Sequence, residues 1–130
     1  MNIPLTPVPP FEIPMPFLEC SLSSESAHIH VSALVDSGAT LNIMPYDIGE
    51  QLGLVWGEQR LPLHMGGTLG GTRAFAVSLQ AQIGSFPPMD MIFAWVERSN
   101  IRMLLGHVNF FQLFRVTFDD KAGCFHIAPS

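Results

Sequence analysis

Alternation of apolar and polar residues over residues 72–83 predicts a strand with one buried face and one solvated face. A spacing of two residues is typical of a half-buried β-strand. The apolar positions are Phe75, Val77, Leu79, Ala81 and Ile83. Residues 60–65 form a second extended segment, and the glycine-rich stretch 66–71 separates the two. This arrangement predicts a β-hairpin with a glycine-rich, mobile tip.

Several other short segments are also predicted to be strands. They cover residues 17–21, 28–35, 89–96, 101–105, 116–118 and 124–127. The segment 89–96 is apolar on both faces, which indicates a central strand. The last two segments are predicted to form a hairpin about the polar turn 119–123.

Two short helices complete the predicted elements. Pro45 fits the first position of a helix that Gly53 ends, and Ile48 and Leu52 share its buried face because they lie four residues apart. Residues 107–114 are predicted to form the second helix. Many short strands with two short helices predict a mostly-β domain with a closed, barrel-like sheet.

The composition and charge indicate which kinds of molecule the protein could bind. The chain has 130 residues, enough for one domain with a core, and it is 48% hydrophobic and 13% charged. Ordinary soluble domains have about 25% charged residues, so we expect apolar surface to be buried against a partner. A net charge of -5 with a single lysine argues against nucleic-acid binding. The apolar run 91–96 is far shorter than the ~20 residues of a membrane-spanning helix.

The first 16 residues contain six prolines and no basic cluster. They are predicted to form an extended, proline-rich arm outside the core rather than a signal peptide. Residues 17–130 are predicted to form the folded domain. Cys20 and Cys124 are too few for a disulfide framework and fall in predicted strands, so we expect buried free thiols.

Asp36 is the first candidate for chemistry, because it follows an apolar strand and precedes Ser37 and Gly38. A carboxylate at such a position is costly to bury unless it is hydrogen-bonded, and its pKa is open to perturbation. Gly38 allows a tight turn and a close approach to the carboxylate. A simple polar turn also explains these three residues when they are taken alone.

Three features occur in one order: Asp36-Ser37-Gly38-Ala39, the glycine-rich tip 66–71, and Leu104-Leu105-Gly106. In this combination residues 17–128 resemble the single-domain retropepsin-like aspartic proteases. That family has an Asp-Thr/Ser-Gly-Ala motif, a glycine-rich hairpin that serves as a flap, and a second signature of two apolar residues before a glycine. The resemblance implies a retropepsin-like closed β-barrel that is active as a homodimer.

The resemblance also implies the roles of individual residues. Asp36 is the implied catalytic residue, and Asp36 of each subunit supplies one half of a dyad, since the chain offers only one suitable carboxylate. Two adjacent carboxylates share one proton, so one takes a proton from water while the other protonates the peptide carbonyl, as is established for aspartic proteases. The implied supporting residues are Ser37, Gly38, Ala39, Thr40 and Gly106. The implied flap residues are Gly66, Gly67, Thr68, Leu69, Gly70 and Gly71.

The implied substrate is an extended peptide with apolar side chains, and no cofactor is needed. The implied pocket walls are Ile43, Ile83, Phe86 and Leu104, although an ordinary core also explains them. The terminal strands, residues 125–128 and the region of Phe17, are implied to interleave at the dimer interface. His107 stands where retroviral members have an arginine, and Thr40 stands in place of its acidic partner. A neutral hydrogen bond is the expected replacement for that ion pair.

Two alternatives remain open from the sequence. A retropepsin-like fold used only for dimerisation or peptide binding would carry the same pattern without turnover. A metal site could use the pairs His28/His30 and Cys124/His126, which are each spaced two apart, but exposed strand positions explain this common spacing better. A phosphate-binding loop at residues 66–71 is disfavoured because no lysine follows it.

Overall fold

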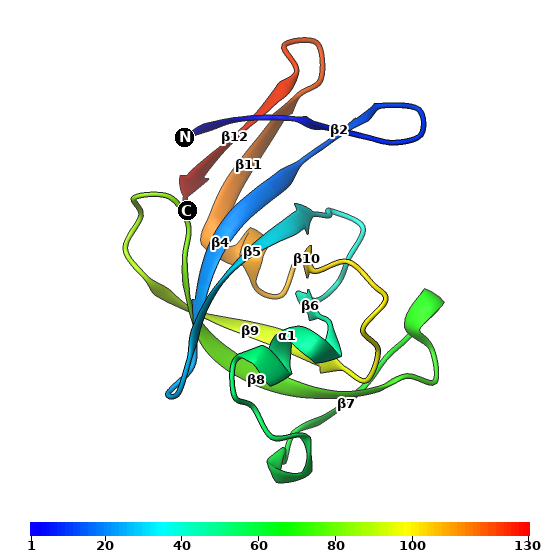
Figure 1. The fold of residues 1–130 in the computed structure, drawn as a ribbon. Helices are drawn as coiled ribbons and strands as arrows, with labels where there is room; N and C mark the ends of the chain where they lie inside the picture. Colours follow the sequence, from blue (N-terminus) through cyan, green and yellow to red (C-terminus); the bar gives the residue numbers. More distant parts are fainter.

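A computed structural model describes all residues, 1–130, and its main element is a sheet that closes on itself (Figure 1). Its strands are β4 (Phe17–Ser23), β5 (His28–Val35), β6 (Ile43–Met44), β7 (Pro62–His64), β8 (Arg73–Gln82), β9 (Met89–Val96) and β10 (Leu104–Leu105). The strand order is β4-β5-β10-β6-β9-β8-β7, and β4 also pairs with β8. This second pairing closes the barrel, so the prediction of a mostly-β, barrel-like fold is confirmed.

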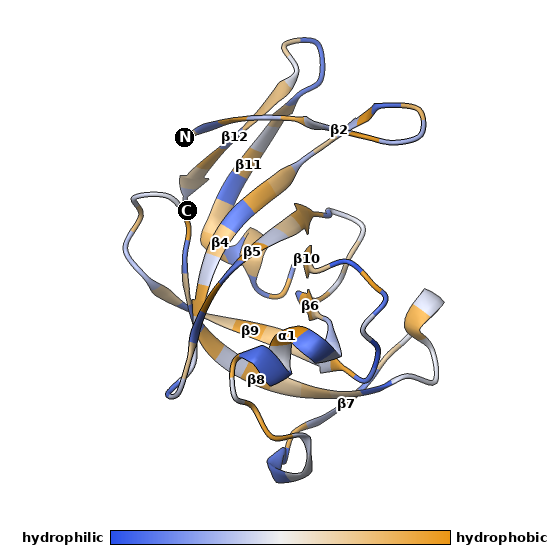
Figure 2. Ribbon diagram, in the orientation of Figure 1, coloured by the Kyte–Doolittle hydropathy of each residue, from blue (hydrophilic) through white to orange (hydrophobic).

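The glycine-rich hairpin and the central strand form as predicted. β7 pairs antiparallel with β8, with Pro62 opposite Phe75 and His64 opposite Arg73. β9 lies between β6 and β8 in the sheet, and Figure 2 shows it largely in the hydrophobic colours. The strand alternation holds for Val77, Leu79 and Ala81, which are buried. Ala74 is buried on the other face of β8, so that face is not solvated at this end.

Two smaller sheets lie above the barrel in Figure 1. β1 (Asn2–Pro4), β12 (Cys124–Pro129) and β11 (Phe114–Asp119) form a three-stranded sheet with β12 in the middle. β2 (Thr6–Val8) and β3 (Ile13–Met15) form a separate two-stranded hairpin. The proline-rich segment is extended as predicted, but Ile3 and Leu5 pack against the main core. The expectation that this segment contributes nothing to the core is therefore wrong.

The first helix agrees with the prediction, and the second is shorter than predicted. α1 spans Tyr46–Gln51 directly after Pro45, and Gly53 has φ of 77° just beyond its end. Short 3₁₀ helices follow at η1 (Trp56–Glu58) and η2 (Gly67–Leu69). α2 covers only Phe110–Leu113, not 107–114. No helix in the structure combines the length and apolar composition needed to cross a bilayer.

The reason for the short second helix lies in the backbone before it. His107 N–H donates to the carbonyl of Ala39 at 3.0 Å, and Val108 N–H donates to the carbonyl of Thr40 at 2.8 Å. The Val108 carbonyl, which would accept the Gln112 N–H in a helix over 107–114, instead accepts the Asn42 N–H at 2.9 Å, so this backbone is held against the loop after β5. Phe114 already belongs to β11, which pairs with β12. The helix is limited by tertiary contacts that its local sequence pattern does not reveal.

Two hydrophobic clusters make up the interior. The larger one fills the barrel and includes Trp95, Phe93, Phe110, Phe114 and Phe125. The smaller one consists of Ile43, Ala74, Ala94 and Val96. Met65 and Leu69 of the glycine-rich hairpin pack against this smaller cluster. The hairpin tip thus packs on apolar side chains of the main sheet.

An aromatic cluster joins α1 to the base of the glycine-rich hairpin. The ring of Trp56 lies 5.0 Å from Trp95 and 5.5 Å from Tyr46, centroid to centroid. Phe75 of β8 lies 4.7 Å from Trp56, and the guanidinium of Arg73 lies 5.9 Å from the same ring. Aromatic pairs at such distances add about 0.5–1.5 kcal/mol beyond their buried area. The base of the hairpin is therefore held against α1 and η1.

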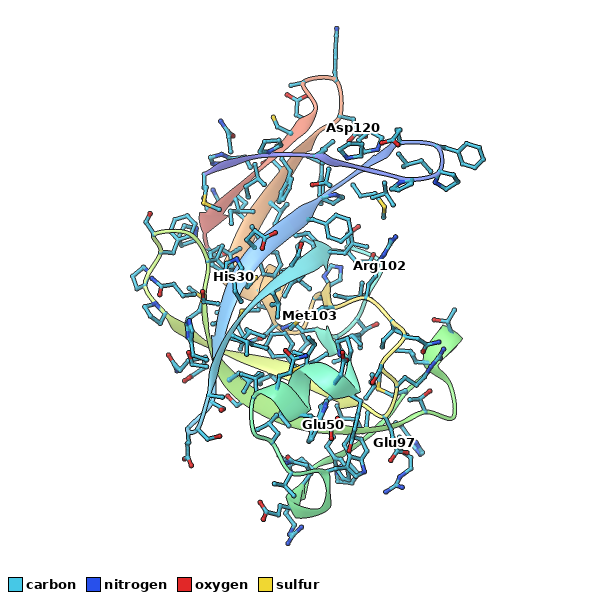
Figure 3. All side chains as sticks on the ribbon, in the orientation of Figure 1. His30, Glu50, Glu97, Arg102, Met103 and Asp120 are labelled. Carbon is cyan, nitrogen blue, oxygen red and sulfur yellow. The ribbon has the colours of Figure 1, made fainter.

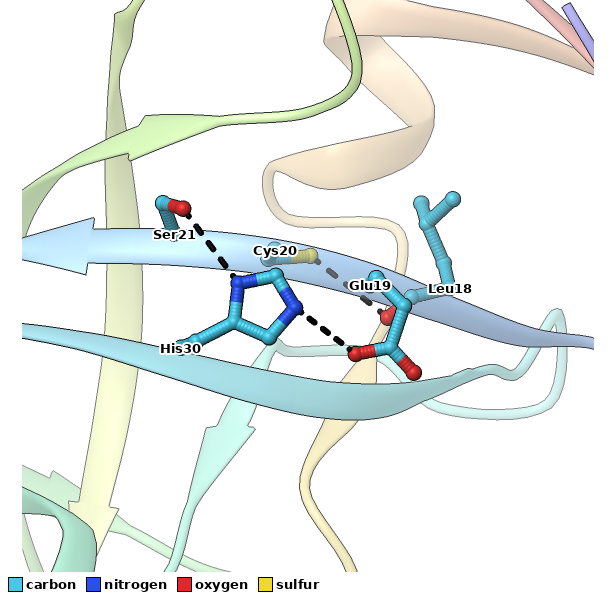
Figure 4. A network of polar contacts seen from close by, with 5 residues as sticks. All are labelled: Leu18, Glu19, Cys20, Ser21 and His30. Atoms are coloured by element: carbon cyan, nitrogen blue, oxygen red, sulfur yellow. Dashed lines mark hydrogen bonds and ion pairs between the residues drawn. The ribbon is translucent and has the colours of Figure 1, made fainter.

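The outer face of β4 and β5 carries a row of polar pairs (Figure 4). His30 contacts Glu19 at 3.0 Å and Ser21 at 3.5 Å, and His28 contacts Ser23 at 2.9 Å. No group of three or more His, Cys, Asp or Glu side chains in the structure is arranged to hold a metal ion. The histidines of this face are engaged with serine and glutamate side chains.

Both cysteines are free, but they differ in burial. Cys20 is buried behind the polar row of β4, and Cys124 is half-buried. Desolvation raises the pKa of the Cys20 thiol from 9.0 to about 12, and the neighbouring Glu19 charge adds to the shift. A thiol with such a pKa is almost entirely protonated at neutral pH, so Cys20 is a packing residue.

Candidate active site

Asp36 lies immediately after β5, at the point where that strand runs parallel to β10. Its backbone N–H donates to the carbonyl of Leu105 at 2.9 Å. Its Oδ1 accepts a hydrogen bond from Gly38 N–H at 2.9 Å, and its carbonyl accepts one from Ala39 N–H at 3.1 Å. The side chain therefore closes a tight turn of the kind that Asp favours. Asp36 remains half-buried and in contact with a cavity.

Gly106 brings the second sequence signature against this turn. A Cβ at residue 106 would lie 2.5 Å from the Leu41 carbonyl oxygen and 2.6 Å from that of Ala39. Real side chains do not tolerate such distances, so only glycine fits here. The parallel pairing of Leu105 with Val35 sets this approach. The two motifs that carried the resemblance are thus adjacent in space.

His107 makes a hydrogen bond where an ion pair stands in the retroviral pattern. Its Nε2 lies 2.8 Å from the carbonyl oxygen of Ser37, so the ring N–H donates to the turn that contains Asp36. Its ring also stacks on Phe111 at 5.0 Å. The partner is a backbone carbonyl rather than the side chain of Thr40. A hydrogen bond thus occupies the place of the ion pair, with a backbone carbonyl as its acceptor.

Asn42 is a positioning residue that the sequence analysis did not identify. Its side chain is fully buried, and it is the only buried polar residue of the chain. Its Oδ1 accepts a hydrogen bond from Gly106 N–H at 2.8 Å. Its Nδ2 donates to the carbonyl of Ile92 at 2.9 Å and to Oδ1 of Asn109 at 3.2 Å. Asn42 therefore ties the loop after β5 to β9 and to the end of β10.

We expect Asn42→Ala to lower the free energy of unfolding by about 3 kcal/mol. The substitution leaves the buried Gly106 N–H and the partly buried Ile92 carbonyl without these partners, and each unsatisfied buried group costs about 1–3 kcal/mol. Urea denaturation followed by circular dichroism measures the change. Gln82→Ala is the matched control, since its exposed amide bonds only the Phe86 carbonyl at 3.3 Å. Equal losses in both variants would contradict the role of Asn42.

A cavity of about 590 Å³ separates Asp36 from the glycine-rich hairpin. Its walls come from the loop after β5, from β6, from β10 and from the hairpin. The lining residues are Asp36, Gly38, Ala39, Thr40, Leu41, Ile43, His64, Met65, Gly66, Gly67, Thr68, Leu69 and Leu104. Asp36 is the one acidic residue among them. The lining combines apolar and polar residues with a single carboxylate, so the cavity can hold a side chain, but it has no second carboxylate that could share a proton with Asp36.

The structure brings together most, but not all, of the predicted site residues. Ile43 and Leu104 line this cavity, and so do Gly66, Gly67, Thr68 and Leu69 of the hairpin tip. Ser37 is exposed beside the cavity, and Gly70 and Gly71 complete the tip without lining it. His64 and Met65 line the cavity although the sequence analysis did not select them. Both residues directly precede the glycine-rich tip in the predicted extended segment 60–65, and this position could have indicated that they lie beside the cavity.

Ile83 and Phe86 are not walls of this cavity, contrary to the prediction. Ile83 is buried in the main core, and Phe86 packs beside it with its ring 5.6 Å from that of Phe114. Both lie at the turn from β8 to β9, at the end of β8 opposite the glycine-rich tip. The alternation that ends at Ile83 correctly predicted that this residue is buried, but an apolar pattern does not distinguish the barrel core from the wall of a site.

Both edges of the strand that contains residues 125–128 are paired within the chain, and the expected interleaving with a second copy stays a prediction. β12 pairs with β1 on one side and with β11 on the other within the same chain. Phe125 and Ile127 are fully buried in the main core. β4, which begins at Phe17, is also paired, to β5 and β8. Strand exchange at these positions would require these pairings to open.

Comparison with known proteins identifies related structures. No protein-family model and no curated protein matches the sequence. The structure is similar to the retroviral protease-like domain of Ddi1 from Leishmania major, with a TM-score of 0.66, 20% identity, and coverage of 89% of this chain and 90% of that one. It is similar to a retropepsin-like aspartic protease from Rickettsia conorii, with a TM-score of 0.67, 13% identity and coverage of 98% of each chain.

A third similar structure is that of EIAV protease in complex with the inhibitor HBY-793. The TM-score is 0.58 at 14% identity, with coverage of 76% of this chain and 88% of that one. The first two structures are described as a retroviral protease-like domain and a retropepsin-like aspartic protease, and the third as a protease bound to an inhibitor. The resemblance expected from the sequence is therefore confirmed at the level of the fold: this chain has the retropepsin-like fold.

Proposed function

We propose that the protein is an aspartic endopeptidase that acts as a homodimer, with Asp36 of each copy forming the catalytic dyad. The observation that carries the proposal is the position of Asp36. It is a half-buried carboxylate on a turn braced by Gly106, and it faces a cavity beneath a glycine-tipped hairpin. A similar structure that is described as a retropepsin-like aspartic protease supports the same class.

The need for a second copy follows from the chemistry. Hydrolysis of a peptide bond without a metal or a nucleophilic side chain requires one group that takes a proton from water and one that gives a proton to the carbonyl oxygen. The cavity contains one carboxylate only. A two-fold axis beside Asp36 would supply the second carboxylate, and the two would then share one proton because like charges a few Å apart do not both ionise.

The remaining residues of the site support this reaction. Gly38 N–H holds one oxygen of Asp36, which leaves the other carboxylate oxygen to face water and substrate. His107 and Gly106 fix the turn from behind. Leu69 and Thr68 of the tip would cover the bound peptide and exclude water. Ser37 is proposed to hydrogen-bond across the dimer beside the dyad.

The lining of the cavity supports an extended peptide with apolar side chains as substrate. Leu41, Ile43, Leu69 and Leu104 form its apolar walls. A backbone in extended conformation would lie between the turn at Asp36 and the hairpin, with alternate side chains directed into such pockets. Ala74 and Ala94 belong to the same cluster as Ile43, and Ala94 lies opposite Ile43 on the neighbouring strand, so small residues adjoin this wall.

The experiment is cleavage of a library of apolar peptides by the purified protein. We expect hydrolysis that a statine-type mimic of the tetrahedral intermediate inhibits and that a chelator does not affect. Binding of the mimic without any cleavage would instead support the alternative, a catalytically inactive retropepsin-like domain that binds peptides. Loss of cleavage on addition of the chelator would contradict the acid-dyad mechanism.

A further inference from the structure

The β2–β3 hairpin exposes large apolar side chains that the rest of the chain does not cover. Phe11, at its turn, is 83% exposed, and Ile13, on β3, is 53% exposed. The two strands pair only with each other, with Val8 opposite Ile13 and Thr6 opposite Met15. A two-stranded hairpin is marginal in water without further packing. Exposed apolar residues on such an element indicate a binding surface.

Both ends of the hairpin are fixed, and one end lies beside Asp36. Leu5 N–H donates to the carbonyl of Gly123 at 2.9 Å, which attaches the first strand to the β11–β12 turn. Val35 N–H donates to the carbonyl of Pro16 at 2.9 Å, one residue before Asp36. The guanidinium of Arg102 contacts the sulfur of Met15 at 3.6 Å. The hairpin therefore has a defined direction where it leaves the body of the protein.

That direction is toward the face of the proposed active site. Figure 1 shows the β2–β3 hairpin, the loop after β5 and the glycine-rich tip projecting toward the same side of the molecule. Figure 3 shows Arg102 on this side, between the hairpin and the barrel. A second copy placed on a two-fold axis beside Asp36 would meet this hairpin.

The sequence of the hairpin favours contact through side chains rather than through strand addition. Pro7 and Pro14 lie opposite each other, and Pro9 and Pro10 precede Phe11 at the turn. Proline has no N–H to donate to an added strand, so both edges are poor templates for pairing. Glu12 is the only charged residue in 6–15. The surface offered to a partner is therefore apolar and nearly uncharged.

We propose that the β2–β3 hairpin is a clasp that holds a second copy of this chain, with Phe11 as its anchor. The inference rests on the proposed function, because the shared dyad places the two-fold axis beside the root of the hairpin. In an isologous dimer the hairpin of each copy contacts the other copy, so the contact occurs twice. Large aromatic residues are the usual anchors of such interfaces.

The test is the dimer dissociation constant of the double variant Phe11→Ser/Ile13→Ser, measured by sedimentation equilibrium. We expect this dissociation constant to be at least tenfold higher than that of the unmodified protein, because the dimer loses its anchoring contacts. Val55→Ser is the matched control, since Val55 is 51% exposed and precedes η1 rather than lying in the hairpin. The control is expected to dimerise normally. A double variant that dimerises as tightly as the unmodified protein would overturn the proposal.

Photo-crosslinking tests the same contact in the full chain without removing apolar surface. A benzophenone amino acid in place of Phe11 is expected to yield a covalent dimer on irradiation, and crosslinks confined to one chain would overturn the proposal. Sedimentation and crosslinking do not depend on turnover. A hairpin-dependent dimer that cleaves no peptide would therefore support the clasp while the proposed function fails. If the protein cleaves peptides and the double variant dimerises as tightly as the unmodified protein, the proposed function would stand and the clasp would be excluded.

Discussion

Replacing Asp36 by asparagine is expected to lower kcat/KM for peptide cleavage by about 10³-fold, because proton transfer by a positioned acid or base contributes about 10²–10⁴-fold. Asparagine has the shape of aspartate but neither takes nor gives a proton at working pH. Its Oδ1 still accepts the Gly38 N–H, which now spans 2.9 Å to Asp36, so the turn is expected to persist. In a homodimer the substitution removes both members of the dyad at once.

The measurement is cleavage of a peptide from the library, with circular dichroism and sedimentation to verify fold and assembly. Asp119→Asn provides a matched control. Asp119 is exposed, and its Oδ1 accepts a hydrogen bond from Ala122 N–H at 3.0 Å, so it closes a turn as Asp36 does but far from the cavity. We expect full activity from this control. Wild-type cleavage by Asp36→Asn would exclude the proposed mechanism.

Gly106→Ala is expected to lower the free energy of unfolding by at least about 1–3 kcal/mol, the usual cost of overpacking, and to abolish cleavage. The added methyl would lie 2.5 Å and 2.6 Å from two backbone carbonyl oxygens, those of Leu41 and Ala39. Backbone does not yield as the end of a flexible side chain does. Relief of the contact therefore displaces the loop that carries Asp36.

Gly57→Ala is the control for Gly106→Ala. No heavy atom lies within 4 Å of a Cβ at residue 57, and its φ is in the ordinary range. Its free energy of unfolding is expected to change by less than about 0.5 kcal/mol, as at other unconstrained surface positions. Urea denaturation of both variants measures the difference. A Gly106→Ala protein that is as stable and active as the control would show that the two motifs do not brace each other.

Features of the fold that depend on local pattern could be predicted from the sequence. The alternation before Ile83 reflects burial of one face of β8, and the apolar run 91–96 reflects the burial of both faces over the last four residues of β9. Each of these signals lies within the strand that it predicts. The glycine-rich tip between two extended segments likewise contains its own turn signal. The turn at Asp36 and its neighbour Gly106 were found because their short motifs resemble those of a known family.

Features that depend on contacts between distant residues could not be predicted in this way. β1 pairs with β12 across almost the whole length of the chain, and no local pattern encodes that register. Asn42 is a single polar residue in an apolar stretch, and only its burial beside Gly106 reveals its role. Ile83 and Ile43 are equally apolar, yet one lies in the barrel core and the other beside the cavity.

The aromatic cluster around Trp56 gives the protein a built-in optical reporter. The chain contains two tryptophans and one tyrosine, and all three lie in this cluster, with Tyr46 5.5 Å from both indole rings. Excitation energy transfers readily between rings so close together, so their emission behaves as that of one centre. Phe75 and Arg73 connect this centre to the strands that carry the glycine-rich tip. The proposed closure of the tip over a ligand is therefore expected to change the intrinsic fluorescence, so it can be tested without attaching a dye.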